Sequence, residues 1–233
     1  MKLNLLENAL DFITKGIDEL FDDEHHFTPV KPTERSVRNY KYGVIHLFGG
    51  FLLLLKERLA RHIPELIYEG SIRKVKEQVK NGNRNPKTVD LDVALERLEI
   101  GPKVTFPAEE LKCIRRMQDL RNAFEHYEVS INPYQVWSET TRFLKIIDQF
   151  LVNQLEIHLE ERPETEGLHS KIRQIEQVWQ RIQEKRVREW HTTMKGLLQS
   201  FKENSDTVVQ DLEIGHIASK RNRANLYVLS RMF

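Results

Sequence analysis

Apolar residues recur at intervals of three and four along most of the chain, and this spacing constrains its fold more than any other feature. The first twenty residues show the pattern clearly. Their apolar positions, spaced by three, four, three, four and three residues, are Leu3, Leu6, Leu10, Ile13, Ile17 and Leu20. Such spacing places one apolar stripe along an amphipathic α-helix. No segment alternates convincingly between apolar and polar residues, so the sequence predicts an all-α fold.

Segments rich in proline, glycine and polar residues divide the chain into a few long helices. The 233 residues include only 10 glycines and 8 prolines, which cluster in a few places. Loops are expected at residues 22–33 and 70–89, the second because of its NGNRNP sequence. After the first twenty residues, the helices are expected at 34–62, 90–99, 107–130, 133–161 and 168–204. The last 29 residues lack clear helical periodicity.

The order of these segments predicts two parts. Residues 1–161 are expected to form an up-and-down bundle of four main helices. The stretch ERPETEG at 161–167 marks a joint. Residues 162–233 would then form an additional C-terminal helical arm and a basic tail.

The most apolar run, YGVIHLFGGFLLLL at residues 42–55, predicts a helix at the centre of the bundle. It is shorter than the roughly 20 residues that a membrane-spanning helix needs, and Lys56 follows at once. The small Gly49-Gly50 pair within it would permit close approach of another helix. We therefore expect a core helix and no membrane segment.

Charge and cysteine content restrict the classes of function. Lys and Arg total 36 against 35 Asp and Glu, so the chain as a whole is not a polycationic nucleic-acid binder. Cys113 is the single cysteine, which excludes an intrachain disulfide and a cysteine-based zinc site. The N-terminal segment carries acids and no small-residue cleavage site, so no signal peptide is expected. These features favour a cytoplasmic location.

The segment LKCIRRMQDLRNAFEHYEVSINP at residues 111–133 carries two stripes with identical spacing. The apolar stripe consists of Cys113, Met117, Leu120, Phe124 and Tyr127, and the polar stripe consists of Arg115, Asp119, Asn122 and His126. At about 100° per residue, the stripes lie on nearly opposite sides of a helix. His126 should therefore face solvent, a cleft or a partner subunit. Asn122 lies one turn before it, whereas Arg121 points roughly 140° away on an ideal helix.

The sequence from Arg121 to His126, RNAFEH, resembles the Arg-x4-6-His signature of the HEPN superfamily, including the polar residue after the arginine. The upstream YKYGVIHLFGGFLLLLKERL also resembles the central helix of that fold. The similarity covers roughly residues 1–160. It implies metal-independent endoribonuclease activity without a cofactor, in a toxin or antiviral-defence effector. It also implies a homodimer whose facing motif helices form one RNA cleft, and an antitoxin or regulatory protein as a partner.

The resemblance assigns a role to each motif residue. His126 would assist attack of a ribose 2′-OH on the adjacent phosphate, since histidine titrates near neutral pH. Arg121 would hold the phosphate with its planar donor fork and stabilise the developing charge. Asn122 would orient His126 or the nucleotide backbone. Some toxin members carry a modifiable tyrosine two positions after the histidine, but position 128 is glutamate here, so that regulation is not expected.

Two other interpretations compete with this one. Arg121 and Glu125 could form an ordinary i, i+4 ion pair, with His126 stabilised by the helix dipole. The chain would then be a non-catalytic helical scaffold that binds protein or RNA. A helical DNA-binding regulator would need a recognition helix with clustered base-reading residues, and none can be placed.

Further candidates lie outside the motif. Arg115 and the tail residues Lys220, Arg221 and Arg223 are candidates for RNA contacts because the tail has few acids. The basic stretch at 181–188 is interpreted as the solvated face of a packed helix. His25-His26 lie in an acidic segment interpreted as a solvated loop, and no metal site is expected. Trp179 and Trp190 are expected to pack in a core or an interface.

Overall fold

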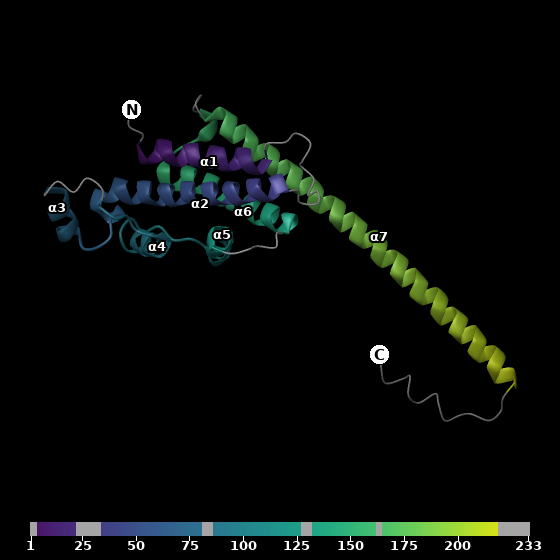
Figure 1. Ribbon diagram of the computed structural model, residues 1–233. Coiled ribbons are helices and arrows are strands. Elements are labelled where there is room, and N and C mark those ends of the chain that lie inside the picture. Colours follow the sequence, from purple (N-terminus) through teal and green to yellow (C-terminus); the bar gives the residue numbers. More distant parts are fainter. Residues whose placement is uncertain (1–3, 22–33, 81–85, 127–131, 162–164, 219–233) are drawn as a thin grey trace. The chain divides into compact units, whose positions relative to one another are not determined.

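The computed structural model describes residues 4–21, 34–80, 86–126, 132–161 and 165–218, and these residues form an all-α structure (Figure 1). The longer helices are α1 (Leu5–Phe21), α2 (Glu34–His62), α5 (Ala108–His126), α6 (Pro133–Leu155) and α7 (Glu166–Ala218). Shorter ones are η1 (Pro64–Ile67), α3 (Ile72–Lys80), α4 (Leu91–Ile100) and η2 (Leu159–Glu161). The all-α prediction is confirmed. Among the described helices, none combines the length and the apolar content that a membrane span requires.

Helix α2 is the central helix, as its sequence predicted. It contacts α1, α4, α5 and α6, and α5 also contacts α6. Its fully buried side chains include Val44, Leu47, Phe51, Leu54, Leu55 and Leu59. Because α2 buries residues on several sides, it packs against several helices and holds them in fixed positions around it. The up-and-down order of four main helices stays a prediction beyond the pairs named here.

Helices α1 and α2 lie side by side and run antiparallel (Figure 1). Glycines permit this contact, since a Cβ on Gly50 would lie 2.9 Å from the Ala9 carbonyl oxygen and 2.6 Å from Cγ1 of Ile13. Further along, a Cβ on Gly16 would meet the backbone of Gly43 at 2.9 Å. The predicted close approach at Gly49-Gly50 is confirmed, and its partner is α1.

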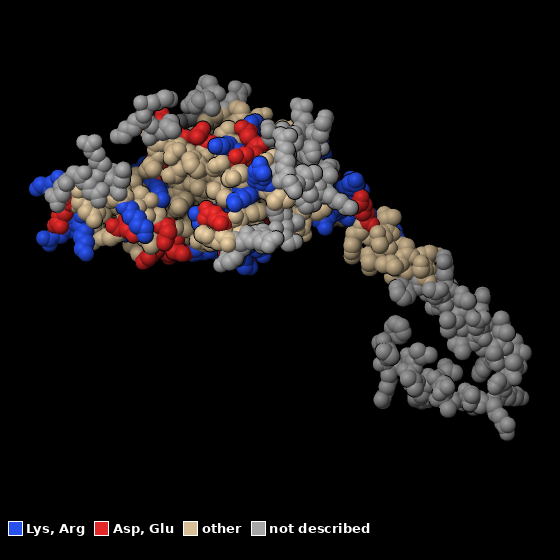
Figure 2. Space-filling view, viewed as in Figure 1, with Lys and Arg blue, Asp and Glu red and all other residues tan. Residues whose placement is uncertain are grey.

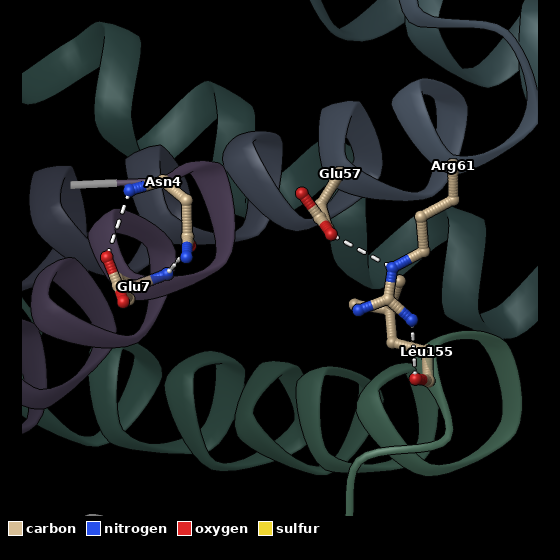
Figure 3. A network of polar contacts seen from close by, with 5 residues as sticks. All are labelled: Asn4, Glu7, Glu57, Arg61 and Leu155. Atoms are coloured by element: carbon tan, nitrogen blue, oxygen red, sulfur yellow. Dashed lines mark hydrogen bonds and ion pairs between the residues drawn. The ribbon is translucent and has the colours of Figure 1, made fainter. Parts of the chain in front are cut away.

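Polar contacts fix the ends of two helices (Figure 3). At the start of α1, Asn4 Oδ1 accepts from the Glu7 N–H at 2.8 Å, and Glu7 accepts from the Asn4 N–H at 3.0 Å. This reciprocal pair is a capping box. At the end of α6, Arg61 of α2 donates to the Leu155 carbonyl at 2.7 Å. Glu156 follows in a left-handed conformation with φ 56°.

The predicted bounds need three corrections. The expected loop at 70–89 contains α3, which was missed because only Val75 of its described side chains is buried. The helix expected to reach residue 161 ends at Leu155, where Arg61 caps it from another helix. The arm continues to Ala218 instead of ending near residue 204. The loop expected at 22–33 and the end of the helix expected at 107–130 lie outside the described residues.

The chain divides into two compact units, Met1–Gln180 and Arg181–Phe233. Helix α7 contributes its first turns to the first unit, where Leu168, Ile172, Ile175 and Trp179 are buried. Packing of Trp179 in a core is therefore confirmed, whereas Trp190 is 59% exposed and does not pack in this core. The division expected at residue 161 stays a prediction about domains.

Candidate functional site

Helix α5 has one buried and one exposed side, and the candidate site lies at its C-terminal end. The carboxylates of Glu109 and Glu110 in its first turn interact favourably with the positive end of the helix dipole. Cys113, Met117 and Phe124 are buried, whereas His126 and the polar stripe before it are exposed or half-buried. This confirms the two stripes that the sequence predicted. Tyr127 lies outside the described residues.

Contacts from three sides hold the Arg121 side chain. Its Nη1 donates to Asn122 Oδ1 at 3.0 Å, and its Nη2 lies 2.9 Å from Glu125 Oε2. Its guanidinium carbon lies 6.0 Å from the ring centroid of Phe48, which belongs to α2. That distance suits a cation–π contact. Arg121 is therefore half-exposed but held in place above the central helix.

His126 shares a carboxylate with Arg121. Its Nε2 lies 3.8 Å from the same Glu125 Oε2 that pairs with the guanidinium. The imidazole is 65% exposed, so it is not a core histidine. The expected outward direction of this side chain is confirmed. One carboxylate therefore brings a guanidinium and an imidazole to the same patch of surface.

Of the other predicted site residues that the structure describes, Asn122 contacts this patch and Arg115 does not. Asn122 accepts from Arg121, so it helps to orient the arginine, and its role toward His126 stays a prediction. Arg115 forms an ion pair with Asp92 of α4 and donates to Gln118 Oε1 at 3.0 Å. It precedes His126 by eleven residues, roughly 16 Å along a helix. Lys220, Arg221 and Arg223 lie outside the described residues, as do His25 and His26.

Sequence reasoning missed two contributors to the geometry. It treated Glu125 as an ordinary ion-pair partner of Arg121, and the i, i+4 spacing gave no sign that the same oxygen also approaches His126. Phe48 comes from a helix more than seventy residues earlier in the chain. Only the packing of α2 against α5 brings its ring under the guanidinium.

A second arginine of α5 also pairs with a glutamate. Arg116 donates to Glu139 Oε1 of α6 at 3.0 Å, and the Glu139 side chain is only 9% exposed. The thiol of Cys113 lies 3.8 Å from the Glu139 carbonyl oxygen. Burial, with a smaller contribution from the Glu139 charge, raises the pKa of this thiol to about 11. These groups join α5 to α6 and are not part of the exposed patch.

The described residues contain no group of three or more His, Cys, Asp and Glu side chains that could hold a metal ion. A surface cavity of about 210 Å³ lies between residues 104–110 and α6, and its lining does not include the Arg121 patch. The chemistry available at the patch is therefore that of a cationic fork, a carboxylate and an imidazole.

No family model, curated protein or solved structure matches this chain.

Proposed function

We propose that this chain is a metal-independent endoribonuclease of the HEPN type, with Arg121 and His126 in its active site. The observation that supports it is the shared Glu125 carboxylate, which holds a guanidinium and an exposed imidazole at one patch of surface. The imidazole of His126 is 65% exposed, so a substrate can reach it. The resemblance of the RNAFEH segment adds the substrate class, and suggests a toxin or defence role restrained by an antitoxin.

The proposed step is transfer of a phosphoester bond within RNA. The imidazole of His126 accepts the proton of a ribose 2′-OH, and the resulting oxygen attacks the adjacent phosphorus. The bond from phosphorus to the 5′ oxygen breaks, and that oxygen takes up a proton. The products are a 2′,3′-cyclic phosphate and a 5′-hydroxyl. Arg121 binds the non-bridging oxygens and stabilises the charge that they gain.

This reaction favours a site composed of two chains. The attacking and leaving oxygens lie on opposite sides of the phosphorus in an in-line displacement, so one imidazole cannot reach both at the same time. A second copy facing the first would supply the other histidine as the proton donor. Because the patch is exposed, another chain can approach it. A homodimer with facing α5 helices is therefore part of the proposal.

Glu125 has a defined place in this scheme. A carboxylate and a phosphate both accept two hydrogen bonds from a guanidinium fork. In the free protein Glu125 occupies the Arg121 fork, and a bound phosphate would have to take its place. Asn122 would keep one guanidinium nitrogen oriented during this exchange. Glu125 thus acts as a placeholder that keeps Arg121 ordered before RNA binds.

The test compares two histidines in equivalent helix positions. His126 and His62 each lie in the last turn of a helix, and both are exposed. We expect His126→Ala to slow cleavage of a tRNA and mRNA pool by about 10²–10⁴-fold, the usual contribution of a general acid or base. His62→Ala should cleave at the parent rate. Equal rates for His126→Ala and the parent, at equal folding, would end the proposal.

Metal dependence is tested separately. Cleavage by the parent protein should continue at the same rate in excess EDTA, because neither Arg121 nor His126 needs a metal to act as described. Loss of cleavage in EDTA, and its recovery with Mg²⁺, would contradict the mechanism even if His126 proved essential.

The partners of Arg121 also favour a second candidate, a non-catalytic scaffold. Asn122, Glu125 and Phe48 together satisfy the guanidinium as they would in a purely structural ion pair. Such a scaffold would bind RNA or a protein without cutting it. Binding of the RNA pool with intact substrate after long incubation, in the parent protein, would select this candidate.

A further inference from the structure

The cavity between residues 104–110 and α6 combines an apolar interior with a polar rim. Its buried lining residues Val104, Ile146 and Phe150 are apolar. The polar residues that line it are exposed or half-buried, and they are Thr105, Glu110, Gln149, Asn153 and Gln154. The volume of about 210 Å³ is below the roughly 300–1,000 Å³ of sites for drug-sized ligands. The cavity therefore suits a ligand of the size of one side chain.

The wall of the cavity at residues 104–107 is fixed by contacts within the first unit. Lys103 turns the chain in front of it with φ 59°, in the left-handed region that few residues other than glycine adopt. Phe106 stacks on Phe150 of α6, with 5.8 Å between the ring centroids. It also contacts Phe51 of α2, with 6.2 Å between the centroids. This wall is therefore in place without a ligand.

Glu110 is the one charged residue among the described residues that line the cavity. Its side chain is half-buried and forms no hydrogen bond or ion pair with another described residue. Its neighbour Glu109, in contrast, pairs with Lys112 at 2.9 Å. Figure 2 shows acidic and basic side chains interspersed in this way over one face of the first unit. The carboxylate of Glu110 is therefore free to accept hydrogen bonds from a ligand.

Three carboxamides of α6 line the cavity opposite Glu110 of α5. In the described part of the chain, the side chains of Gln149, Asn153 and Gln154 form no hydrogen bonds. Each amide oxygen accepts hydrogen bonds, and an ionised carboxylate only accepts them. Two helices thus bring acceptors without partners to one small cavity. A ligand rich in donors would satisfy them.

We propose that this cavity binds a guanidinium group, which donates to the Glu110 carboxylate and to amide oxygens of α6. A guanidinium carries five N–H donors in one plane and no acceptor, and it pairs with a carboxylate through two parallel hydrogen bonds. Its weakly hydrated faces pack on aromatic rings, and Phe106 lines the cavity. An ammonium ion has fewer donors and is more strongly hydrated, so it fits this cavity less well.

The charge of the lining argues against other ligands. A phosphate, free or in RNA, would meet a carboxylate and no Lys, Arg or His among the described lining residues. A calcium ion takes about six to eight oxygen ligands, usually from several carboxylates, and the lining described here has one carboxylate. The guanidinium itself could belong to a free small molecule or to an arginine of another protein.

The first test titrates the full chain with methylguanidine and, separately, with methylammonium at the same ionic strength. Amide NMR signals of residues 104–110 and 146–154 should shift and saturate with methylguanidine. The Kd should lie in the millimolar range, because the ligand has few atoms. Methylammonium should bind more weakly. Shifts that do not saturate, or equal affinities for the two ions, would overturn the proposal.

The second test compares two neighbouring acids. Glu110→Gln removes the charge that lines the cavity, and Glu109→Gln removes an equal charge one residue earlier, outside the lining. Both changes affect the first turn of α5. Glu110→Gln should weaken methylguanidine binding by about ten-fold, the usual effect of losing a charged hydrogen-bond partner. Glu109→Gln should bind as the parent does. Equal affinities of the two variants would contradict the role of Glu110.

A further pair of variants examines the carboxamides. Gln149→Leu removes one amide from the rim, and Gln135→Leu is the matched change at another exposed position of α6. Only Gln149→Leu should weaken binding, by a few-fold, since a neutral hydrogen bond contributes less than a charged one. Equal affinities of these two variants would contradict a contact between Gln149 and the ligand.

The last test identifies the source of the guanidinium. A capped Gly-Arg-Gly peptide presents the group on a peptide backbone, and capped Gly-Lys-Gly is its control. If the arginine peptide binds at least as tightly as methylguanidine, the cavity accepts an arginine of another protein. If it binds more weakly, the ligand is a free guanidinium compound. Failure of both guanidinium ligands to bind would overturn the proposal. No RNA is present in these measurements, so their outcome does not depend on the ribonuclease proposal.

Discussion

Helix α5 supplies the arginines of two arginine–glutamate pairs, which lie in different surroundings. Arg116 reaches across to Glu139 of α6, whose side chain is 9% exposed and whose second carboxylate oxygen is buried without a hydrogen-bond partner. Arg121 pairs with Glu125 on its own helix, next to an exposed histidine. The distances from guanidinium nitrogen to carboxylate oxygen, 3.0 and 2.9 Å, are nearly equal. Distance alone therefore does not distinguish them.

Burial of the carboxylate separates the two pairs. The Glu139 side chain is only 9% exposed, so loss of Arg116 would leave its carboxylate poorly hydrated. This pair joins two helices and is expected to be structural. Glu125 lies near the surface, so water can hydrate it when a substrate phosphate takes its place at Arg121. The second pair can therefore open at little cost. A pair that must exchange partners during a reaction has to be of this second kind.

The largest expected difference between the pairs is in catalysis. Arg121→Ala should lower RNA cleavage by about 10²–10³-fold, the usual effect of removing one donor to a developing oxyanion. Arg116→Ala should stay within a few-fold of the parent at a temperature where it remains folded. Initial rates on one labelled RNA measure both. Equal losses of cleavage in the two variants would contradict a catalytic role that belongs to Arg121 and not to Arg116.

The next effect is on stability, and it has the opposite order. Arg116→Ala should lower the free energy of unfolding by about 2 kcal/mol, because it leaves the Glu139 carboxylate buried and unpaired. Arg121→Ala should cost less than about 1 kcal/mol, since Glu125 can be hydrated. Urea unfolding of the three proteins at neutral pH compares them. A larger loss for Arg121→Ala would reverse the assignment of the two pairs.

Stability at alkaline pH tests the burial of the Cys113 thiol, which lies close to Glu139. Burial raises the pKa of the Cys113 thiol to about 11, above its ordinary value near 9. Between these values the unfolded chain releases the thiol proton while the folded chain keeps it, so stability falls as pH rises. By pH 10 the loss should be about 1 kcal/mol relative to pH 8. Cys113→Ala should lack this part of the loss, and urea unfolding at both pH values gives the difference.

The periodicity of apolar residues predicted most helices because each buries a stripe that local spacing reveals. It gave α2 its bounds and its central place, and it separated the two sides of α5. It missed α3, since a short helix that buries little carries a weak stripe. It missed the last turns of α7 for a related reason. Their apolar residues are interrupted by Ser205, Thr207 and Asp211.

Contacts between distant segments were beyond the sequence. Nothing near Leu155 in the sequence indicates that Arg61 caps its carbonyl and ends α6 there. In the same way, the motif around Arg121 does not reveal the Phe48 ring beneath it. Local spacing did place His126 on the exposed side, because that depends on one helix alone. The ribonuclease assignment itself stays a prediction that the cleavage assays decide.

The smallest expected effect concerns the placeholder role of Glu125. Glu125→Gln keeps the shape of the side chain but removes the charge that competes with phosphate for Arg121. An exposed i, i+4 pair is worth a few tenths of a kcal/mol, so stability should change by less than about 0.5 kcal/mol. The same few tenths of a kcal/mol should appear as a roughly two-fold lower KM for RNA, because phosphate no longer has to displace a charged carboxylate from Arg121. Glu139→Gln, the matched change in the buried pair, should leave KM unchanged. If Glu125→Gln instead raises KM, Glu125 contributes to RNA binding in its own right, and the two pairs differ in more than burial.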